Sequence, residues 1–207
     1  MGKSSSWYRQ HANDAYVKKA KAEGKRSRAT FKLTEIMDKY SLCLKKGAVV
    51  VDLGCAPGSW CQELAVRKRE GGAIIGVDVL PMKPVSGVQF IQADFSASET
   101  QRKLEEVLSG AKTDIVLSDM APEMSGNKLV DQTGMINLNE LTLDFTVNHL
   151  RRGGDLLLKT FMGEGFNTFR RKLTGCFKTV KVIKPAASRR TSSEMFLLAM
   201  NFNGRKP

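Results

Sequence analysis

Cysteine and histidine are scarce in this 207-residue chain, which contains four of the former and two of the latter. No two cysteines form a C-x-x-C pair, so the sequence predicts neither a disulfide framework nor a zinc site, and no other metal is expected. A reducing, cytoplasmic location fits this cysteine usage. Long apolar runs are missing too. None approaches the roughly 18 residues of a membrane span, and the N-terminus contains no apolar core of a secretion signal.

Acidic residues are nearly missing from the two ends of the chain. Residues 1–46 contain 12 Lys and Arg against 4 Asp and Glu, and residues 166–207 contain 10 against 1, whereas residues 47–165 contain 11 against 16. An ordinary solvated surface would not segregate charge so strongly, so we expect the ends to hold a polyanion around chemistry in the middle. The predicted phosphate contacts are Lys18, Lys19, Lys21, Arg26, Arg28, Arg189 and Arg190.

Hydrophobic periodicity and turn residues predict an alternation of strands and helices. Residues 13–39 are expected to form two helices within a basic N-terminal helical extension (1–46), followed by a core (47–207) in the same single domain. In the core, strands are expected at 49–52, 73–78, 88–92, 114–119, 155–161, 179–184 and 194–202, and helices at 58–69, 98–109, 135–150 and 166–174. The stretch 120–134 is expected to be a mobile loop, and Arg151 and Arg152 to close the helix before them. This order predicts an α/β, Rossmann-like fold, with helices on both faces of a mostly parallel seven-stranded sheet and an antiparallel C-terminal strand.

Polar residues stand where the apolar strands end, namely Asp52, Asp78, Asp94, Asp119 and Lys159. Because the carboxyl ends of parallel strands share one edge of a sheet, we expect these side chains to surround a ligand. Gly54 and Gly58 lack a Cβ and precede a helix start, so a small ligand is expected to approach the backbone closely there. The glycine spacing is not G-x-G-x-x-G, which disfavours a dinucleotide and hence a nicotinamide oxidoreductase.

Longer stretches carry a resemblance to a known family. The loop Asp52-Leu53-Gly54-Cys55-Ala56-Pro57-Gly58 is similar to the D-x-G-x-x-P-G loop of S-adenosylmethionine-dependent methyltransferases. Six segments in order, SRATFKLTEI, VVDLGCAPGSWCQ, VDVLPM, SDMAPEMSG, LLLKTFMGEGF and KPAASRRTSSEMFLLA, resemble the FtsJ/RrmJ family of ribosomal RNA 2′-O-ribose methyltransferases, from about residue 7 to the C-terminus. Ser59, where relatives often have glycine, is a small departure.

The resemblance implies roles for particular residues. It implies that S-adenosylmethionine is the cofactor and that a catalytic tetrad is present. The implied cofactor-binding residues are Gly54, Pro57, Gly58, Trp60, Asp78, Asp94 and Asp119, and the implied tetrad is Lys32, Asp119, Lys159 and Glu194.

The tetrad suits methyl transfer to a ribose 2′-hydroxyl, a poor nucleophile that must lose its proton as it attacks. Lys159 is the expected base, because burial on an apolar strand and a neighbouring cation can lower the pKa of a lysine. Lys32 is expected to supply that cation or to hold the nucleophile. Asp119 is expected to orient Lys159 near the sulfonium, and Glu194 to position the ribose or a lysine.

The implied activity is methylation of a uridine ribose in 23S ribosomal RNA, in the A-loop, during maturation of the large ribosomal subunit. Two alternatives stay open: a tRNA or mRNA-cap 2′-O-ribose methyltransferase, and a non-catalytic RNA-binding assembly factor. A base N-methyltransferase would need an N-P-P-Y-like strand end, where this chain has SDMAP at 118–122. A monomer is expected.

Overall fold

The computed structural model describes residues 14–189 and 191–207. The described part begins with two helices, α2 (Ala15–Ala22) and α3 (Ala29–Tyr40). Strands and helices then alternate as β1 (Val49–Leu53), α4 (Ser59–Arg67), β2 (Ala73–Asp78), β3 (Gln89–Gln92), α5 (Ser98–Leu108), β4 (Thr113–Ser118), α6 (Lys128–His149), β5 (Leu150–Phe161), α7 (Phe166–Cys176), β6 (Phe177–Ile183) and β7 (Glu194–Phe202). The expected α/β order is confirmed.

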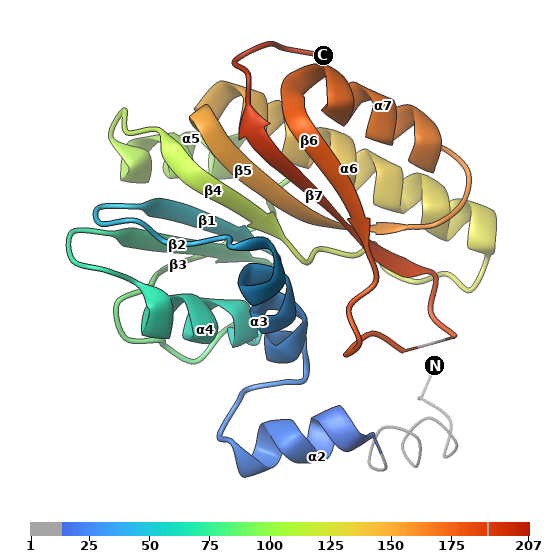
Figure 1. The fold of residues 1–207 in the computed structure, drawn as a ribbon, viewed down its shortest axis with the longest axis horizontal. Helices are drawn as coiled ribbons and strands as arrows, with labels where there is room; N and C mark the ends of the chain where they lie inside the picture. The colour runs from blue at the N-terminus through green and yellow to red at the C-terminus, as the bar shows by residue number, and fades with distance from the viewer. Residues whose placement is uncertain (1–13, 190) are drawn as a thin grey trace.

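The seven described strands form one sheet in the order β3-β2-β1-β4-β5-β7-β6. Neighbours from β3 to β5 are parallel, whereas β7 is antiparallel to both β5 and β6. Figure 1 shows α3 and α4 on one side of the sheet and α5, α6 and α7 on the other. Because β7 runs backwards, its first residue lies at the edge where β1, β2, β4 and β5 end.

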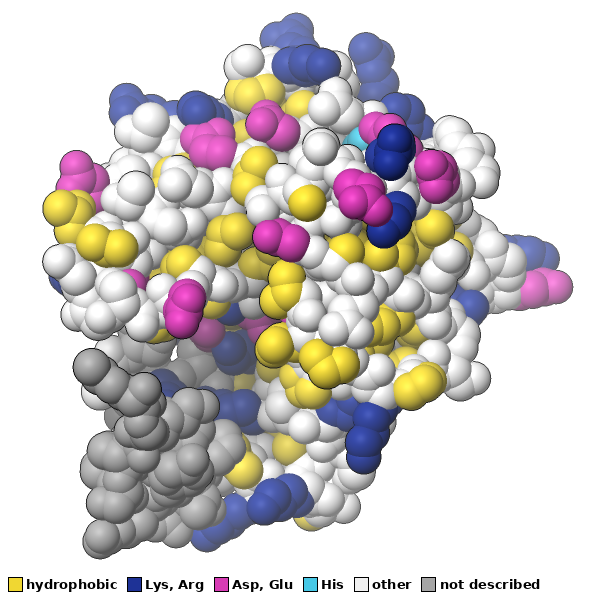
Figure 2. Space-filling view, turned by 180° about the vertical axis from the view of Figure 1, so that it is seen from behind, with side chains coloured by type: hydrophobic (Ala, Val, Ile, Leu, Met, Phe, Trp, Pro, Cys, Tyr) yellow, Lys and Arg dark blue, Asp and Glu magenta, His cyan; other side chains and the backbone are white. Residues whose placement is uncertain are grey.

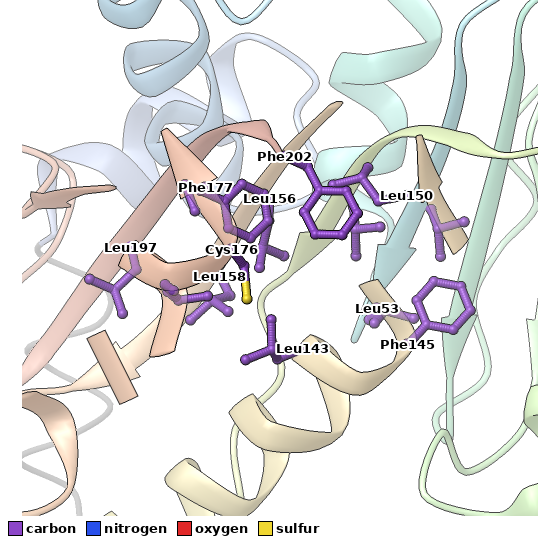
Figure 3. Close-up of a cluster of buried hydrophobic side chains, with 14 of the residues drawn as sticks. Leu53, Leu143, Phe145, Leu150, Leu156, Leu158, Cys176, Phe177, Leu197 and Phe202 are labelled. Atoms are coloured by element: carbon purple, nitrogen blue, oxygen red, sulfur yellow. The ribbon is translucent and has the colours of Figure 1, made fainter. Parts of the chain in front are cut away.

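Alternate residues of the central strands enter two separate cores. Val51 lies in register with Ile75 of β2, and both pack in the cluster that contains α5, α6 and α7. The preceding pair, Val50 and Ile74, packs in the cluster that contains α3 and α4. Figure 3 shows Leu143 of α6 beneath the side chains of β5 and β7. Burial on both faces explains why these strands read as continuous apolar runs.

Helix α6 begins at Lys128, seven positions before the expected start, so the prediction of a loop over 120–134 is wrong beyond residue 127. The Asn127 side chain caps this helix by accepting hydrogen bonds from the N–H groups of Leu129 (3.0 Å) and Val130 (3.4 Å). Leu129 and Val130 are exposed, which broke the apolar periodicity on which the prediction depended. Within the described residues, no helix is long and apolar enough to cross a membrane.

The end of α6 also differs from the expectation. The helix stops at His149, and β5 starts at Leu150 rather than near residue 155. Arg151 therefore lies in a strand and closes no helix. Its Nε instead donates to Asp114 Oδ1 at 2.6 Å, which holds the first residues of β5 against the start of β4. A tertiary ion pair of this kind leaves no local signal in the sequence.

Candidate active site

The residues expected at the strand ends meet at one edge of the sheet. Asp78 is the last residue of β2, Asp119 directly follows β4, and Lys159 lies near the end of β5. Glu194 reaches the same edge from β7, where it pairs in register with Phe161. Lys32 comes from α3, which packs against the start of α4 on one face of the sheet. The fold thus brings together side chains from the whole length of the chain.

Lys159 and Asp119 form a buried ion pair. Lys159 is 8% exposed, and its Nζ lies 3.0 Å from Asp119 Oδ1. The angle of that contact does not suit a hydrogen bond, and the ammonium donates instead to the Asp119 carbonyl. Asp119 Oδ1 is consequently a buried acceptor without a hydrogen-bond donor in the described structure. Such an atom is costly to leave unsatisfied and is suited to a polar ligand.

Lys32 and Glu194 form a second ion pair, with Nζ 2.7 Å from Oε1. Both side chains are largely buried, at 12% and 15% exposure. Burial works to raise the pKa of Glu194, but the charge and hydrogen bond of Lys32, the Ser188 bond and the charge of Lys159 together hold that pKa below its usual value. The expectation that Lys32 supplies a cation beside Lys159 or holds the nucleophile stays a prediction, and the structure adds a carboxylate partner for Lys32.

Ser188 was not singled out from the sequence. It is 7% exposed, and its Oγ lies 2.7 Å from Glu194 Oε1. Its own N–H donates to the Pro185 carbonyl at 2.9 Å, which fixes the turn that carries it. The only available signal was its place in the segment 184–199 that carries the family resemblance, in which three other serines and threonines gave no reason to prefer it.

The glycine loop, residues 54–58, connects β1 to α4. Gly54 and Gly58 have φ angles of 75° and 98°, which favour glycine. A Cβ on Gly54 would lie 2.8 Å from the backbone nitrogen of Met120, so this glycine is required by the approach of the loop after β4. We expected the missing Cβ of Gly54 to make room for a ligand, but Met120 takes up that space.

Asp78 fastens the glycine loop to the end of β2. Its Oδ2 accepts a hydrogen bond from the Ala56 N–H at 2.8 Å, and its Oδ1 accepts one from the Leu80 N–H at 2.8 Å. Asp94 is exposed, and hydrogen bonds from the side chain and backbone of Ser96 hold the pKa of this carboxyl below its usual value. Both carboxyl groups therefore lie beside the loop or at the open edge beyond it.

Asp52 and Trp60 have side chains enclosed in the interior, away from the open edge. Asp52 is fully buried, and burial, followed by the neighbouring Cys61, raises the pKa of this carboxyl well above its usual value. It belongs to the interior beneath the loop and not to the open edge. Trp60 is 2% exposed, packs with its ring tilted against that of Phe196, and donates from Nε1 to the Ala29 carbonyl at 2.9 Å. A cofactor contact by Trp60 would therefore involve its backbone, in the first turn of α4, and not its buried indole.

The predicted phosphate contacts fall into two groups. Lys18, Lys19 and Lys21 are exposed on α2. In contrast, Arg28 is largely buried: it pairs with Asp14 and donates to the Ala187 carbonyl, and burial, then Arg189, lowers its pKa. Arg26 also bonds within the fold, so neither arginine has a guanidinium free for phosphate.

Arg189 lies half-exposed, 3.9 Å from the carboxylate of Asp14, and Arg190 lies outside the described residues. Figure 2 shows acidic side chains mainly over the upper and middle parts of the face, and Lys and Arg side chains both along its upper rim and in its lower part. In the described parts of the chain, 14–189 and 191–207, no group of three or more His, Cys, Asp or Glu is placed to hold a metal ion.

Comparison with known proteins decides the family. The model of the FtsJ-like methyltransferase family matches residues 25–202. The chain belongs to the FtsJ-like methyltransferase family. A protein from Azoarcus sp. (strain BH72) named ribosomal RNA large subunit methyltransferase E is 50% identical over 96% of each chain. One of the same name from Acinetobacter baumannii is 46% identical over the whole chain and 94% of the relative. A crystal structure of a ribosomal RNA methyltransferase from Plasmodium falciparum superimposes with a TM-score of 0.77 at 37% identity, over 87% of this chain and 100% of that one.

The family model begins at residue 25 and so covers the strand-end site, Lys32 and Glu194, but not α2. Membership of the family therefore supports the assignment of the methyltransferase core. The predicted RNA-binding role of the exposed lysines of α2 is supported by their charge and position.

Proposed function

We propose that this FtsJ-like methyltransferase transfers a methyl group from S-adenosylmethionine to the 2′-hydroxyl of a uridine in the A-loop of 23S ribosomal RNA. The observation that carries the proposal is the convergence of two ion pairs, Lys159–Asp119 and Lys32–Glu194, at the edge where the parallel strands end. The names of relatives that align over nearly the full chain support ribosomal RNA of the large subunit as the substrate class.

The residues at this edge fit S-adenosylmethionine. Asp119 Oδ1 is a buried acceptor that receives no hydrogen bond from residues 14–189 or 191–207, and Asp94 presents an exposed carboxylate whose pKa is lowered by hydrogen bonds from Ser96. We propose that the glycine loop, the first turn of α4, Asp78, Asp94 and Asp119 hold the cofactor, which supplies an electrophilic methyl group on a sulfonium. The N–H groups at the start of α4 and the carboxylates together suit a ligand that carries both signs of charge.

The tetrad has the parts that 2′-hydroxyl methylation needs. Lys159 is fixed by its two contacts with Asp119, so its Nζ has one position. Once the ammonium has released a proton to solvent, the neutral amine takes the 2′-hydroxyl proton from that position as the oxygen attacks the methyl group. Lys32 and Glu194 fix each other, so that a ribose in contact with this pair is oriented before the reaction. We assign the proton transfer to Lys159 and the orientation of the ribose to Lys32 and Glu194.

RNA binding is assigned to the exposed lysines of α2 and to Arg189, with Arg190 kept as an expectation outside the described structure. Exposed ammonium groups contact phosphates without reading sequence, which suits a substrate selected by its position in a large RNA. We propose a monomer that acts in the cytoplasm. A non-catalytic assembly factor would have no need for the paired buried lysines, and no feature of the site favours tRNA or an mRNA cap over ribosomal RNA.

A labelled-methyl transfer assay tests the proposal directly. Purified protein is incubated with labelled S-adenosylmethionine and large ribosomal subunits or free 23S RNA that lack the modification. We expect one labelled methyl group per RNA, mapped to a uridine ribose in the A-loop. Labelling of a base, or of tRNA in preference to ribosomal RNA, would overturn the assignment.

A further inference from the structure

The segment 24–28, between α2 and α3, lies along the start of α4. The Gln62 side chain donates to the Gly24 carbonyl at 3.2 Å and accepts from the Arg26 N–H at 3.3 Å. Ser27 Oγ lies 2.7 Å from Ser59 Oγ, in a bond either hydroxyl can donate. This part of the N-terminal extension is therefore attached to the helix that follows the glycine loop.

The guanidinium of Arg26 extends from this segment onto two loops. Its Nη1 donates to the carbonyls of Pro57, at 2.8 Å, and Lys83, at 2.6 Å. Its Nη2 donates to the Pro84 carbonyl at 2.7 Å. Pro57 belongs to the glycine loop, whereas residues 83 and 84 belong to the loop after β2. One side chain thus holds the two loops at a fixed separation.

Gly58 shows how closely the guanidinium packs on the glycine loop. A Cβ built on Gly58 would lie 2.6 Å from Arg26 Nη1 and 2.7 Å from Met82 Sδ. The space above this glycine is filled by two protein side chains, so the glycine is required for the packing of Arg26 as well as for its φ of 98°.

We infer that Arg26 is a positioning residue of the cofactor site, which holds the glycine loop against the loop after β2. The inference rests on the proposed function, in which these loops hold S-adenosylmethionine. It replaces the sequence-based prediction that Arg26 contacts RNA phosphate. Because Lys32 lies in the first turn of α3, directly after this segment, the contact also fixes the methyl-donor loop relative to one member of the tetrad.

Arginine is suited to this role and lysine is not. The guanidinium is planar and has five donors in a fixed arrangement, so it can serve three carbonyls on two loops at once. An ammonium on a flexible stem keeps the positive charge but cannot bridge the same three acceptors. Replacement of Arg26 by lysine should therefore preserve attraction for phosphate and lose the separation of the loops.

The test measures the affinity for S-adenosylmethionine by titration calorimetry in the absence of RNA, for wild type, Arg26→Lys and Arg26→Ala. We expect both variants to bind about tenfold or more weakly, from the loss of charge-assisted hydrogen bonds. Arg170→Lys, an exposed arginine of α7, is the matched control and should bind as wild type. Thermal unfolding of Arg26→Lys checks that it is folded.

A second measurement separates the two possible roles of Arg26. RNA binding by wild type, Arg26→Lys and Arg26→Ala is measured across a series of salt concentrations. A wild-type affinity for RNA with weakened cofactor binding supports the inference. Wild-type cofactor affinity in both variants overturns it, and a reduced salt slope in Arg26→Ala would then identify a phosphate contact. Failure of the wild-type protein itself to bind S-adenosylmethionine would instead contradict the proposed function.

Discussion

Lys32 and Glu194 form an ion pair of 2.7 Å, although one lies in α3 near the N-terminus and the other begins β7 near the C-terminus. Around this pair the two basic ends of the chain come together: Arg28 pairs with Asp14 and bonds to the Ala187 carbonyl. These contacts join the N-terminal extension to the segment before β7 beside a single site.

The first prediction concerns Lys159. Lys159→Ala should lower the rate of methyl transfer about 10²–10⁴-fold, the usual contribution of a general base, while S-adenosylmethionine still binds. The measurements are single-turnover transfer to large ribosomal subunits and calorimetric cofactor binding. Lys172→Ala removes a lysine of a partly exposed ion pair with Glu140 on α6 and α7 and serves as the control. Near-normal transfer by Lys159→Ala would exclude it as the base.

The second prediction concerns Ser188, whose hydroxyl helps to lower the pKa of Glu194. A lowered carboxyl pKa in the folded state stabilises the fold above the usual value, 4.5, and that stabilisation is lost as pH falls through the lowered pKa. Ser188→Ala should therefore cost about 1 kcal/mol at neutral pH and progressively less in acid. Urea unfolding at a series of pH values measures this.

Two variants make the Ser188 experiment specific. Ser188→Thr keeps the hydroxyl and should restore the wild-type pH dependence of unfolding. In a Glu194→Gln background the carboxyl cannot titrate, so Ser188→Ala should have an effect that does not vary with pH. An equal cost of Ser188→Ala at every pH in the wild-type background would show that the serine supports the turn but not the charge of Glu194.

The third prediction concerns RNA binding by α2. Lys18→Glu with Lys21→Glu should weaken RNA binding and reduce the slope of log affinity against log salt by about 1.5, since each phosphate contact contributes about 0.7–0.9. The control reverses the same number of charges on α5, at Arg102 and Lys103, which are exposed and distant in sequence from both basic ends. Equal changes of slope in the two double variants would point to net charge rather than to contacts of α2.

The fourth prediction concerns the core beneath α6. Leu143 is fully buried among the strands, so Leu143→Ala should lower the free energy of unfolding by about 2–5 kcal/mol through the lost apolar contact and the cavity left behind. Leu129 lies in the first turn of the same helix and is 56% exposed, so Leu129→Ala should cost less than about 0.5 kcal/mol. Chemical denaturation of both variants makes the comparison, and similar losses would contradict the assigned burial.

The sequence by itself determined the α/β order, the strand-end residues and the family resemblance. Strands buried on both faces must be apolar along their length, and glycine is favoured where φ is positive. Both features can therefore be recognised from short stretches of the sequence. The local pattern did not predict the first turn of α6, because its apolar residues Leu129 and Val130 are exposed. It also did not predict the start of β5, which is held by the ion pair between Arg151 and Asp114.

Only the tertiary structure decided which charged residues work together. It pairs Lys32 with Glu194 and places the Ser188 hydroxyl on the same carboxylate. It also buries Asp52 in the interior and directs Arg26 onto the two loops assigned to the cofactor site. A charged side chain carries no local record of its partner, because the free energy of burying it depends on donors and acceptors that folding brings from distant parts of the chain.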